Sequence, residues 1–162
     1  MNPQGLVLDF VPDPARAARE MTRVARPGGM VAAYVWDYAG RMDFLRRFWD
    51  AAVALREEAG AHDEGRRFPL CHPDALATAL RAGGLDEVAT KALEVATVFS
   101  DFDDYWTPFL SGQAPAPGYV ATLGAADREA LRERLRATLP FAPDGSIHLV
   151  ARAWAARGRV PS

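Results

Sequence analysis

The longest uninterrupted apolar segment of the chain runs from Met30 to Trp36. Seven apolar residues without alternation are typical of a strand that is covered on both faces, as in parallel sheets. The segment before it predicts a helix that begins at Asp13-Pro14, because aspartate is a good N-cap and proline is favoured in the first turn. Pro27-Gly28-Gly29 ends this helix. The order helix, turn and buried strand indicates α/β layering.

The rest of the chain alternates between helical and strand-like patterns. Strands are expected at Val88–Phe99 and Ser146–Ala156, where apolar residues recur with period two. Asp43 is expected to cap one helix, and Ser100-Asp-Phe-Asp103 has the form of a capping box for another. The helices are expected at Phe44–Ala59, from His72-Pro73-Asp74 to Gly83-Gly84, after Asp103 and at Ala126–Thr138, with loops at His62–Cys71 and Gly112–Gly118.

Composition indicates a globular domain without a strong electrostatic preference. Of the 162 residues 49% are hydrophobic and 25% are charged, and the formal net charge of −2 offers no case for nucleic-acid binding. The single cysteine excludes an internal disulfide. The longest apolar run is too short to span a bilayer, and no signal-peptide pattern opens the chain, so we expect a cytoplasmic protein without a membrane segment.

Two common kinds of site are not indicated. Neither a G-x-G-x-x-G nor a G-x-x-x-x-G-K-[ST] phosphate loop occurs, and both Gly-Gly pairs end helices. Ligand-type side chains gather at His62, Asp63, Glu64, Cys71 and His72, but their spacing matches no structural zinc pattern. A solvated loop explains them better, and we expect no metal. Nucleophilic catalysis by Cys71 would require a histidine and an orienting group beside it.

Aromatic residues offer a candidate binding site. Ligands in open α/β sheets bind beyond the carboxyl ends of the strands. Trp36, Asp37 and Tyr38 occupy such an end, directly after the apolar strand. Most aromatic side chains belong to cores, yet a pocket for an apolar or aromatic substrate is a reasonable hypothesis at this position.

One long segment carries a family resemblance. Leu6–Gly29 and the strand that follows resemble the type-11 group of class I S-adenosylmethionine-dependent methyltransferases, in which L-h-h-v-p-d-p precedes R-E-x-x-R-V-L-[KR]-P-G-G and a buried strand. This sequence departs at Ala25, where leucine is usual, and at Asp9, where histidine or asparagine is common. His72–Leu85 resembles the next helix of the family, and the final strand fits its last strand.

The resemblance implies an incomplete Rossmann-like fold. The family's glycine-rich loop (D-x-G-x-G) and its ribose-binding acidic residue should precede Leu6, where this sequence has only five residues. We therefore expect a single domain, 1–162, that forms the C-terminal portion of a methyltransferase domain. It should contain about three strands, two of them antiparallel at the C-terminal end, with covering helices. Residues 98–140 should form a helical cap-like insertion between the last two strands.

The resemblance also implies a function. S-adenosylmethionine would donate a methyl group to a small-molecule acceptor, but this chain should not bind the cofactor tightly by itself. Gly5, Leu6 and Val7 should approach the cofactor, while Trp36, Asp37, Tyr38, Trp106 and Phe109 should line the acceptor pocket; no catalytic residue is indicated. A complementing N-terminal half or self-association through an exposed sheet edge is the expected partnership. The alternative is a non-enzymatic remnant that serves as a protein-interaction module.

Overall fold

The computed structural model describes residues 2–5 and 8–162 and divides the chain into two compact units. Unit 1 combines residues 1–37, 68–94 and 152–162, and unit 2 combines residues 38–67 and 95–151. We expected one domain with a cap-like insertion at 98–140, and this segment lies within unit 2 between two strands of the chain. Each unit has a hydrophobic core of its own.

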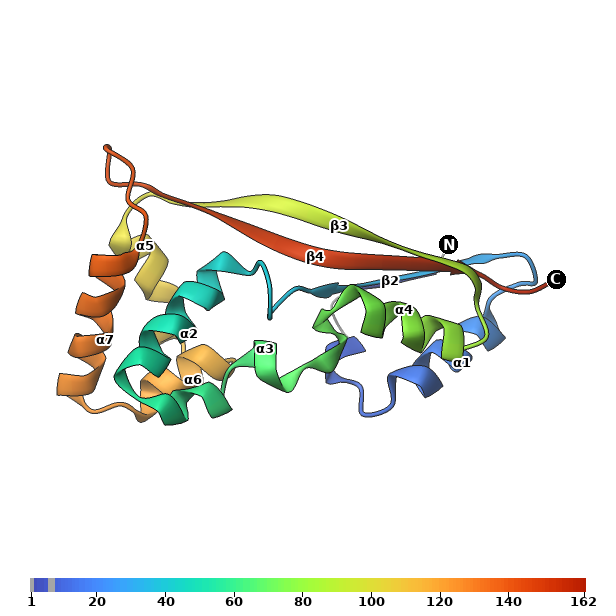
Figure 1. Cartoon of the computed structure of the whole chain (residues 1–162), viewed down its shortest axis with the longest axis horizontal. Helices are drawn as coiled ribbons and strands as arrows, with labels where there is room; N and C mark the ends of the chain where they lie inside the picture. Colours follow the sequence, from blue (N-terminus) through green and yellow to red (C-terminus); the bar gives the residue numbers. More distant parts are fainter. Residues whose placement is uncertain (1, 6–7) are drawn as a thin grey trace. The chain divides into compact units, whose positions relative to one another are not determined.

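A four-stranded mixed sheet organises unit 1 (Figure 1). The order is β1-β2-β4-β3, with β1 parallel to β2 and β4 antiparallel to β2. The last strand of the sequence is therefore inserted between β2 and β3. β3 and β4 are long and contribute residues to both units. The strands are β1 (Asn2–Gly5), β2 (Met30–Trp36), β3 (Asp86–Phe99) and β4 (Ile147–Arg159).

The sequence predicted about three strands, and the structure adds a short fourth strand at Asn2–Gly5. This segment contains a proline and polar residues, so no hydrophobic alternation marks it as a strand. Its backbone pairs in parallel with β2, from Asn2 opposite Val31 to Gly5 opposite Tyr34. Tertiary pairing overrides the weak local preference here.

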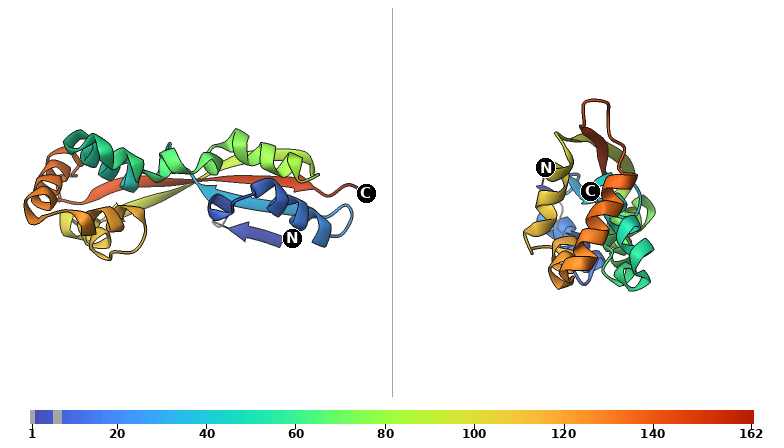
Figure 2. Two further views of the ribbon diagram at one scale, coloured as in Figure 1. Left: turned by 90° about the horizontal axis from the view of Figure 1, so that it is seen from below. Right: turned by 90° about the vertical axis from the view of Figure 1, so that its left-hand side faces the viewer.

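Two helices cover one face of the sheet in unit 1. They are α1 (Pro14–Val24) and α4 (Pro73–Ala82), which lie on the same side of the strands in both views (Figures 1 and 2). Val31, Ala33 and Val35 of β2 are buried in this core. The N-cap that the sequence predicts for α1 is confirmed, since the Asp13 carboxylate accepts a hydrogen bond from Arg16 N at 2.8 Å. The helix ends at Val24 with Ala25 as C-cap, before Pro27-Gly28-Gly29.

The prediction that β2 is covered on both faces was wrong. Ala32 and Trp36 are only half-buried, and Tyr34 on the same face is 37% exposed. Among the described residues no helix of unit 1 packs on this face (Figure 1). β2 therefore has apolar side chains on both faces, although only one face is buried in the core of unit 1.

Unit 2 is helical and has an aromatic core. The rings of Phe44, Phe48 and Phe109 form a stack, with centroid separations of 4.6 Å from Phe44 to Phe109 and 4.4 Å from Phe48 to Phe109. The Tyr105 hydroxyl donates to the carbonyl of Phe44 at 2.9 Å. The α-helices of this unit are α2 (Asp43–Leu55), α3 (Glu64–Arg67), α5 (Phe102–Trp106), α6 (Pro115–Thr122) and α7 (Ala125–Thr138).

Several boundaries in unit 2 differ from those predicted. α2 ends at Leu55 and is followed by a 3-10 turn at Glu57–Ala61, and another such turn, Thr107–Leu110, follows α5. The expected loop at Gly112–Gly118 contains the start of α6, because Pro115 can occupy the first turn of a helix as well as a loop. The expected loop at His62–Cys71 contains α3 in unit 2 and the 3-10 turn Pro69–Cys71 in unit 1. Another 3-10 turn, Leu8–Phe10, precedes α1.

Two predicted caps were wrong in detail. α2 begins after Met42, and the Asp43 carboxylate accepts a hydrogen bond from Val150 N instead. The capping box is displaced by one residue from the predicted position. Asp101 caps α5 by accepting from Asp104 N at 2.8 Å, and Asp104 accepts from Ser100 N at 2.9 Å. Aspartate carboxylates therefore accept hydrogen bonds from the backbone N–H groups at the start of α5, as predicted, but from positions one residue later in the sequence.

The close packing of α1 against α4 depends on a glycine. A Cβ added at Gly83 would lie 2.4 Å from the Cβ of Ala18, whereas a Cβ at Gly118 would meet nothing within 4 Å. We predict that Gly83→Ala lowers the free energy of unfolding by about 1–3 kcal/mol through overpacking. The control Gly118→Ala lies inside α6 and should raise it by about 0.5–1 kcal/mol. Urea denaturation of both variants is the measurement, and equal effects would contradict the packing.

Candidate functional site

The carboxyl ends of the parallel strands β1 and β2 form the first candidate site. β1 ends at Gly5, which pairs with Tyr34, and β2 ends at Trp36. In open α/β sheets this edge is where ligands bind. Two of the predicted cofactor-contacting residues, Leu6 and Val7, lie outside the described residues, so Gly5 alone is placed at this edge.

Asp37 follows β2 and is buried in an ion pair. Its Oδ2 atom accepts from Nε of Arg152 at 2.6 Å, and its backbone N donates to the carbonyl of Arg152 at 2.9 Å. The Arg152 guanidinium also lies over the ring of Trp154, 4.7 Å from its centroid, and 3.8 Å from Glu94. The carboxylate that the sequence placed in a substrate pocket is therefore engaged with β4, and it fixes the end of β2 to that strand.

Asp9 was missed at the sequence level and stands out in the structure. It lies in the 3-10 turn that follows β1, and its Oδ1 atom is buried without a hydrogen-bond partner among the described residues. Burial raises the pKa of Asp9 to about 6. The available signal was the departure from the family pattern, in which histidine or asparagine is common at this position.

The predicted aromatic pocket residues fall into different units. Trp36 and Asp37 belong to unit 1, whereas Tyr38, Trp106 and Phe109 belong to unit 2. Trp106 and Phe109 are only 5% and 1% exposed and are part of the aromatic core. None of the cavities described below is lined by them, and their contact with a substrate stays a prediction.

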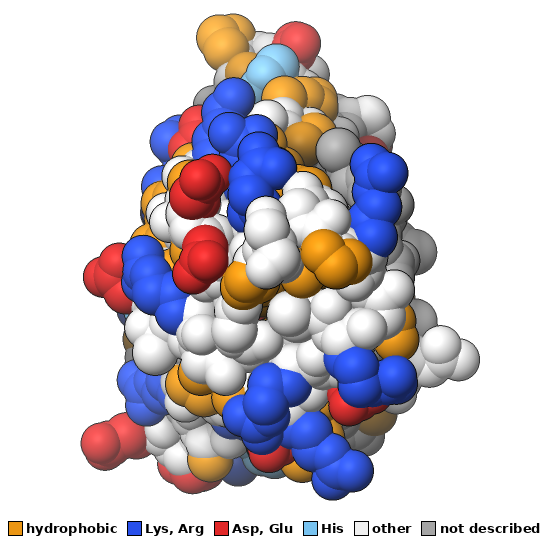
Figure 3. All heavy atoms as spheres, turned by 90° about the vertical axis from the view of Figure 1, so that its right-hand side faces the viewer, with side chains coloured by type: hydrophobic (Ala, Val, Ile, Leu, Met, Phe, Trp, Pro, Cys, Tyr) orange, Lys and Arg blue, Asp and Glu red, His pale blue; other side chains and the backbone are white. Residues whose placement is uncertain are grey.

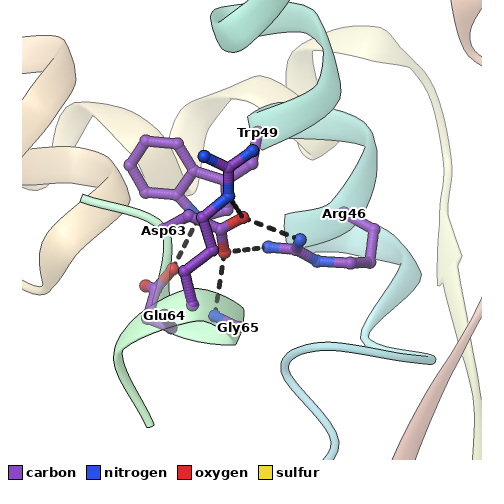
Figure 4. Close-up of polar contacts among 6 residues, drawn as sticks. Arg46, Trp49, Asp63, Glu64 and Gly65 are labelled. Carbon is purple, nitrogen blue, oxygen red and sulfur yellow. Dashed lines mark hydrogen bonds and ion pairs between the residues drawn. The ribbon is translucent and has the colours of Figure 1, made fainter. Parts of the chain in front are cut away.

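A buried polar cluster in unit 2 is the second candidate site (Figure 4). The guanidinium of Arg46 donates to both carboxylate oxygens of Asp63, with Nη1 to Oδ2 at 2.9 Å. The backbone N of Gly65 donates to Oδ1 of Asp63 at 2.8 Å. Trp49 Nε1 donates to Oε2 of Glu64 at 2.5 Å. Burial raises the pKa of Glu64, and the hydrogen bond from Trp49 partly opposes this effect.

The sequence-based interpretation of this segment as a solvated loop was wrong. Asp63 and Glu64 are 3% and 4% exposed, and Cys71 is buried. The partners Arg46 and Trp49 lie 17 and 15 residues earlier in the sequence, on α2. No short motif joins them, so the pairing is visible only in the fold. Among the described residues no group of three or more His, Cys, Asp or Glu side chains could hold a metal ion.

A cavity of about 420 Å³ adjoins this cluster. Two glycines shape its surroundings: a Cβ at Gly60 would lie 2.4 Å from Nη1 of Arg66, and a Cβ at Gly65 would lie 2.8 Å from the carbonyl O of Tyr38. At Gly65 a larger residue would meet backbone, whereas at Gly60 it would displace the end of the exposed Arg66 side chain. The lining residues that matter below are Arg46, Trp49, Asp50, Val53, Asp63 and Arg66.

Neither the charge distribution on the face shown in Figure 3 nor the hydropathy of the described helices indicates a further site. The face shown in Figure 3 carries Lys and Arg side chains with Asp and Glu side chains among them, without a continuous field of one sign. In the described part of the chain no helix is long and apolar enough to cross a membrane.

Weak binding of S-adenosylmethionine by this chain alone stays a prediction. No D-x-G-x-G segment occurs in the 162 residues. At the carboxyl edge the described groups are the backbone of Gly5, the paired carboxylate of Asp37 and the buried carboxyl of Asp9. No glycine loop is among these groups, and the Asp37 carboxylate is already paired with Arg152.

Asp9 should make the stability of the chain depend on pH. Because its folded pKa is raised above the ordinary value of 3.8 to about 6, the protonated form favours folding. Its contribution is present below pH 4 and is lost as the pH rises through 6. Asp9→Asn should therefore become more stable relative to the parent chain between pH 4.5 and 7.5, by about 1 kcal/mol after allowance for partial exposure.

Urea denaturation at both pH values measures this effect. Asp144→Asn is the control, because hydrogen bonds from Ser146 hold the pKa of Asp144 below its usual range. The stability of that variant relative to the parent should stay nearly constant over the same pH interval, because the Asp144 carboxyl is ionised throughout it in both the folded and the unfolded chain. A pH-independent difference for Asp9→Asn would contradict the assignment.

The buried ion pair of Arg46 should matter far more than a neighbouring exposed arginine. Arg46→Met leaves the buried Asp63 carboxylate without its main counter-charge and should cost about 3 kcal/mol of unfolding free energy. Arg66→Met removes a side chain that is 63% exposed and should change it by no more than about 0.5 kcal/mol. Chemical denaturation compares the two, and similar losses would show that the cluster does not stabilise unit 2.

Comparison with known proteins finds similar solved structures. No family model matches the chain, and no curated protein shows significant similarity. Among solved structures, a Bacillus halodurans C-125 protein with a provisional methyltransferase name aligns over 99% of this chain with a TM-score of 0.51 and 12% sequence identity. The chain spans 63% of that protein's length.

A second solved structure is less similar. A phosphoethanolamine N-methyltransferase 2 from Haemonchus contortus, in complex with phosphomonomethylethanolamine and S-adenosylhomocysteine, aligns with a TM-score of 0.46 and 10% identity, over 99% of this chain and 33% of its own. At 12% identity the first likeness concerns the fold alone. The α/β fold of this chain is similar to a methyltransferase fold.

Proposed function

We propose that this chain forms the C-terminal part of an S-adenosylmethionine-dependent methyltransferase that acts on a small-molecule acceptor. The observation that carries the proposal is the likeness to a methyltransferase structure over 99% of the chain, at a TM-score of 0.51. The P-G-G segment before β2 supports it independently, because it was read from the sequence and ends α1 as expected. The type-11 group is the proposed family.

The cofactor-binding half of the enzyme must then lie outside these residues. β1 is at one edge of the sheet and has only four residues, and one face of β2 lacks a covering helix among the described residues. Buried parallel strands normally have both faces covered. We therefore propose that strands and helices of a complementing N-terminal half extend the sheet beyond β1 and bring the glycine-rich loop.

The residues of this chain would position the reactants. Methyl transfer requires in-line placement of the nucleophile and the methyl group, and it needs no general base unless the acceptor must lose a proton. The proposed contacts to cofactor are Gly5, Leu6 and Val7. Of the residues predicted to line the acceptor pocket, Trp106 and Phe109 belong to the aromatic core and Asp37 is paired with Arg152, so Trp36 is the residue that we propose as pocket lining.

A specific observation favours a second candidate function, a protein-interaction module. β3 is an edge strand of 14 residues, and Leu93, Val95 and Val98 on it are exposed, Val95 by 59%. Exposed apolar edge strands are templates for pairing with another chain. An interaction module needs no cofactor, so a measurement of cofactor binding by the longer polypeptide distinguishes it from a methyltransferase.

Titration with S-adenosylhomocysteine tests the first proposal. We expect no saturable binding to the 162-residue chain by calorimetry, because no glycine loop is present. Reading the DNA upstream of Met1 should reveal an in-frame D-x-G-x-G segment, and the longer polypeptide should bind with a micromolar Kd. Absence of binding by the longer polypeptide, or tight binding by the chain alone, would contradict the proposal.

The exposed sheet edge and the uncovered face of β2 should make the isolated chain self-associate. Exposed apolar strand edges and faces promote self-association, so light scattering should report a mass above that of the monomer. Co-expression with the complementing half should give a defined species instead. A stable monomer with cooperative unfolding would count against the incomplete sheet.

The acceptor pocket can be separated from the core by comparing two tryptophans in the longer polypeptide. Trp106→Ala truncates a buried side chain and should cost about 3–5 kcal/mol of stability, lowering folding and every affinity together. Trp36→Ala, at a half-buried strand end, should weaken acceptor binding with a smaller loss of thermal stability. If both variants lose stability and affinity equally, the pocket assignment must be abandoned.

A further inference from the structure

The cavity in unit 2 contains an arginine whose terminal N–H groups are not used by the described part of the protein. Arg66 lines the cavity and has one charged contact there, from Nε to Oδ2 of Asp63 at 3.9 Å. No hydrogen bond joins its Nη1 or Nη2 atom to another described residue. A guanidinium presents five donors in a planar fork, so most of this one is available to a ligand.

The Arg66 side chain is 63% exposed, and its guanidinium lies beside Gly60 and Asp63. Its guanidinium lies against Gly60 so closely that a Cβ there would be 2.4 Å from Nη1. On the other side it faces Asp63, which is held in turn by Arg46 and by the backbone N of Gly65.

The lining of the cavity carries two arginines, Arg46 and Arg66, and two aspartates, Asp50 and Asp63, and Arg66 is the cation without a close partner. The Asp63 carboxylate already receives two hydrogen bonds from Arg46 and one from Gly65, so Arg66 adds a positive charge that no described group neutralises at hydrogen-bond distance. Arginine forks match carboxylate and phosphate groups geometrically. Val53 and the Trp49 side chain add apolar lining, so the cavity of about 420 Å³ suits a small organic molecule rather than an ion alone.

We propose that this cavity is a binding site for a small molecule that carries a carboxylate or a phosphate group, held by Arg66. The anionic group would lie against the Nη atoms, and the body of the molecule against Trp49 and Val53. The carboxylate of Asp50, which also lines the cavity, favours a ligand with a hydroxyl or amino donor on the opposite side. The site is independent of the cofactor edge in unit 1 and does not require the proposed methyltransferase activity.

Nuclear magnetic resonance titration of the 162-residue chain tests the proposal. Inorganic phosphate and sodium acetate are the two probes, each at constant ionic strength against sodium chloride. We expect the Trp49 indole N–H and the Gly65 amide to shift saturably with at least one probe, at a millimolar Kd. Phosphate alone would identify a phosphate site, acetate alone a carboxylate site, and both a general anion site. Saturation by neither probe, or shifts that chloride reproduces, would overturn the proposal.

Matched variants assign the effect to Arg66. Arg66→Ala should weaken binding at least about tenfold, since charge-assisted hydrogen bonds are lost. Gly60→Ala should weaken it as well, because the added methyl group displaces the guanidinium. Arg128→Ala, an exposed arginine on α7 that does not line the cavity, should bind as the parent does. Circular dichroism of each variant shows that it is folded, and unchanged affinity in a folded Arg66→Ala protein would overturn the proposal.

Discussion

The antiparallel pairing of β2 with β4 is the constraint on which unit 1 depends. It runs without a break from Met30 opposite Arg159 to Trp36 opposite Ala153. Because directly opposite residues share a face, this register places Val31, Ala33 and Val35 on the side of α1 and α4. The same register brings Asp37 beside Arg152, although 115 residues separate them in the sequence. A shift by one residue would expose the core face and break the ion pair.

Each unit contains one buried carboxylate that is held by an arginine. Asp37 with Arg152 fixes the end of β2 in unit 1, and Asp63 with Arg46 fixes the segment after α2 in unit 2. Asp9 is different, because one of its oxygens is buried and unpartnered among the described residues. Such groups are costly, and they are commonly retained where a ligand or a further segment completes their surroundings. Its place after β1, at the edge from which the sheet would be extended, agrees with that explanation.

The sequence predicted those elements whose signals are local. Asp13-Pro14 acts through its own backbone conformation and side chain, so the start of α1 was predicted correctly, and the helix ends three residues before Pro27. β1 and the cluster around Asp63 were missed because their pairing partners lie far along the chain. β2 was misjudged for a related reason: its composition suits a strand with two covered faces, and only one is covered within the described residues. The same residues supported the methyltransferase resemblance, which the fold comparison supports at the level of architecture.

Amide hydrogen exchange, followed by mass spectrometry with and without the complementing half, tests most directly that this sheet continues beyond β1. In the isolated chain the account predicts slow exchange in β2 and in Ala153–Arg157 of β4, and fast exchange in β1, whose outer edge has no partner among the described residues. Addition of the polypeptide that carries the glycine-rich loop should slow exchange in β1 most of all. Exchange in β1 that is already slow in the isolated chain, or that is unchanged by the added half, would contradict the claim.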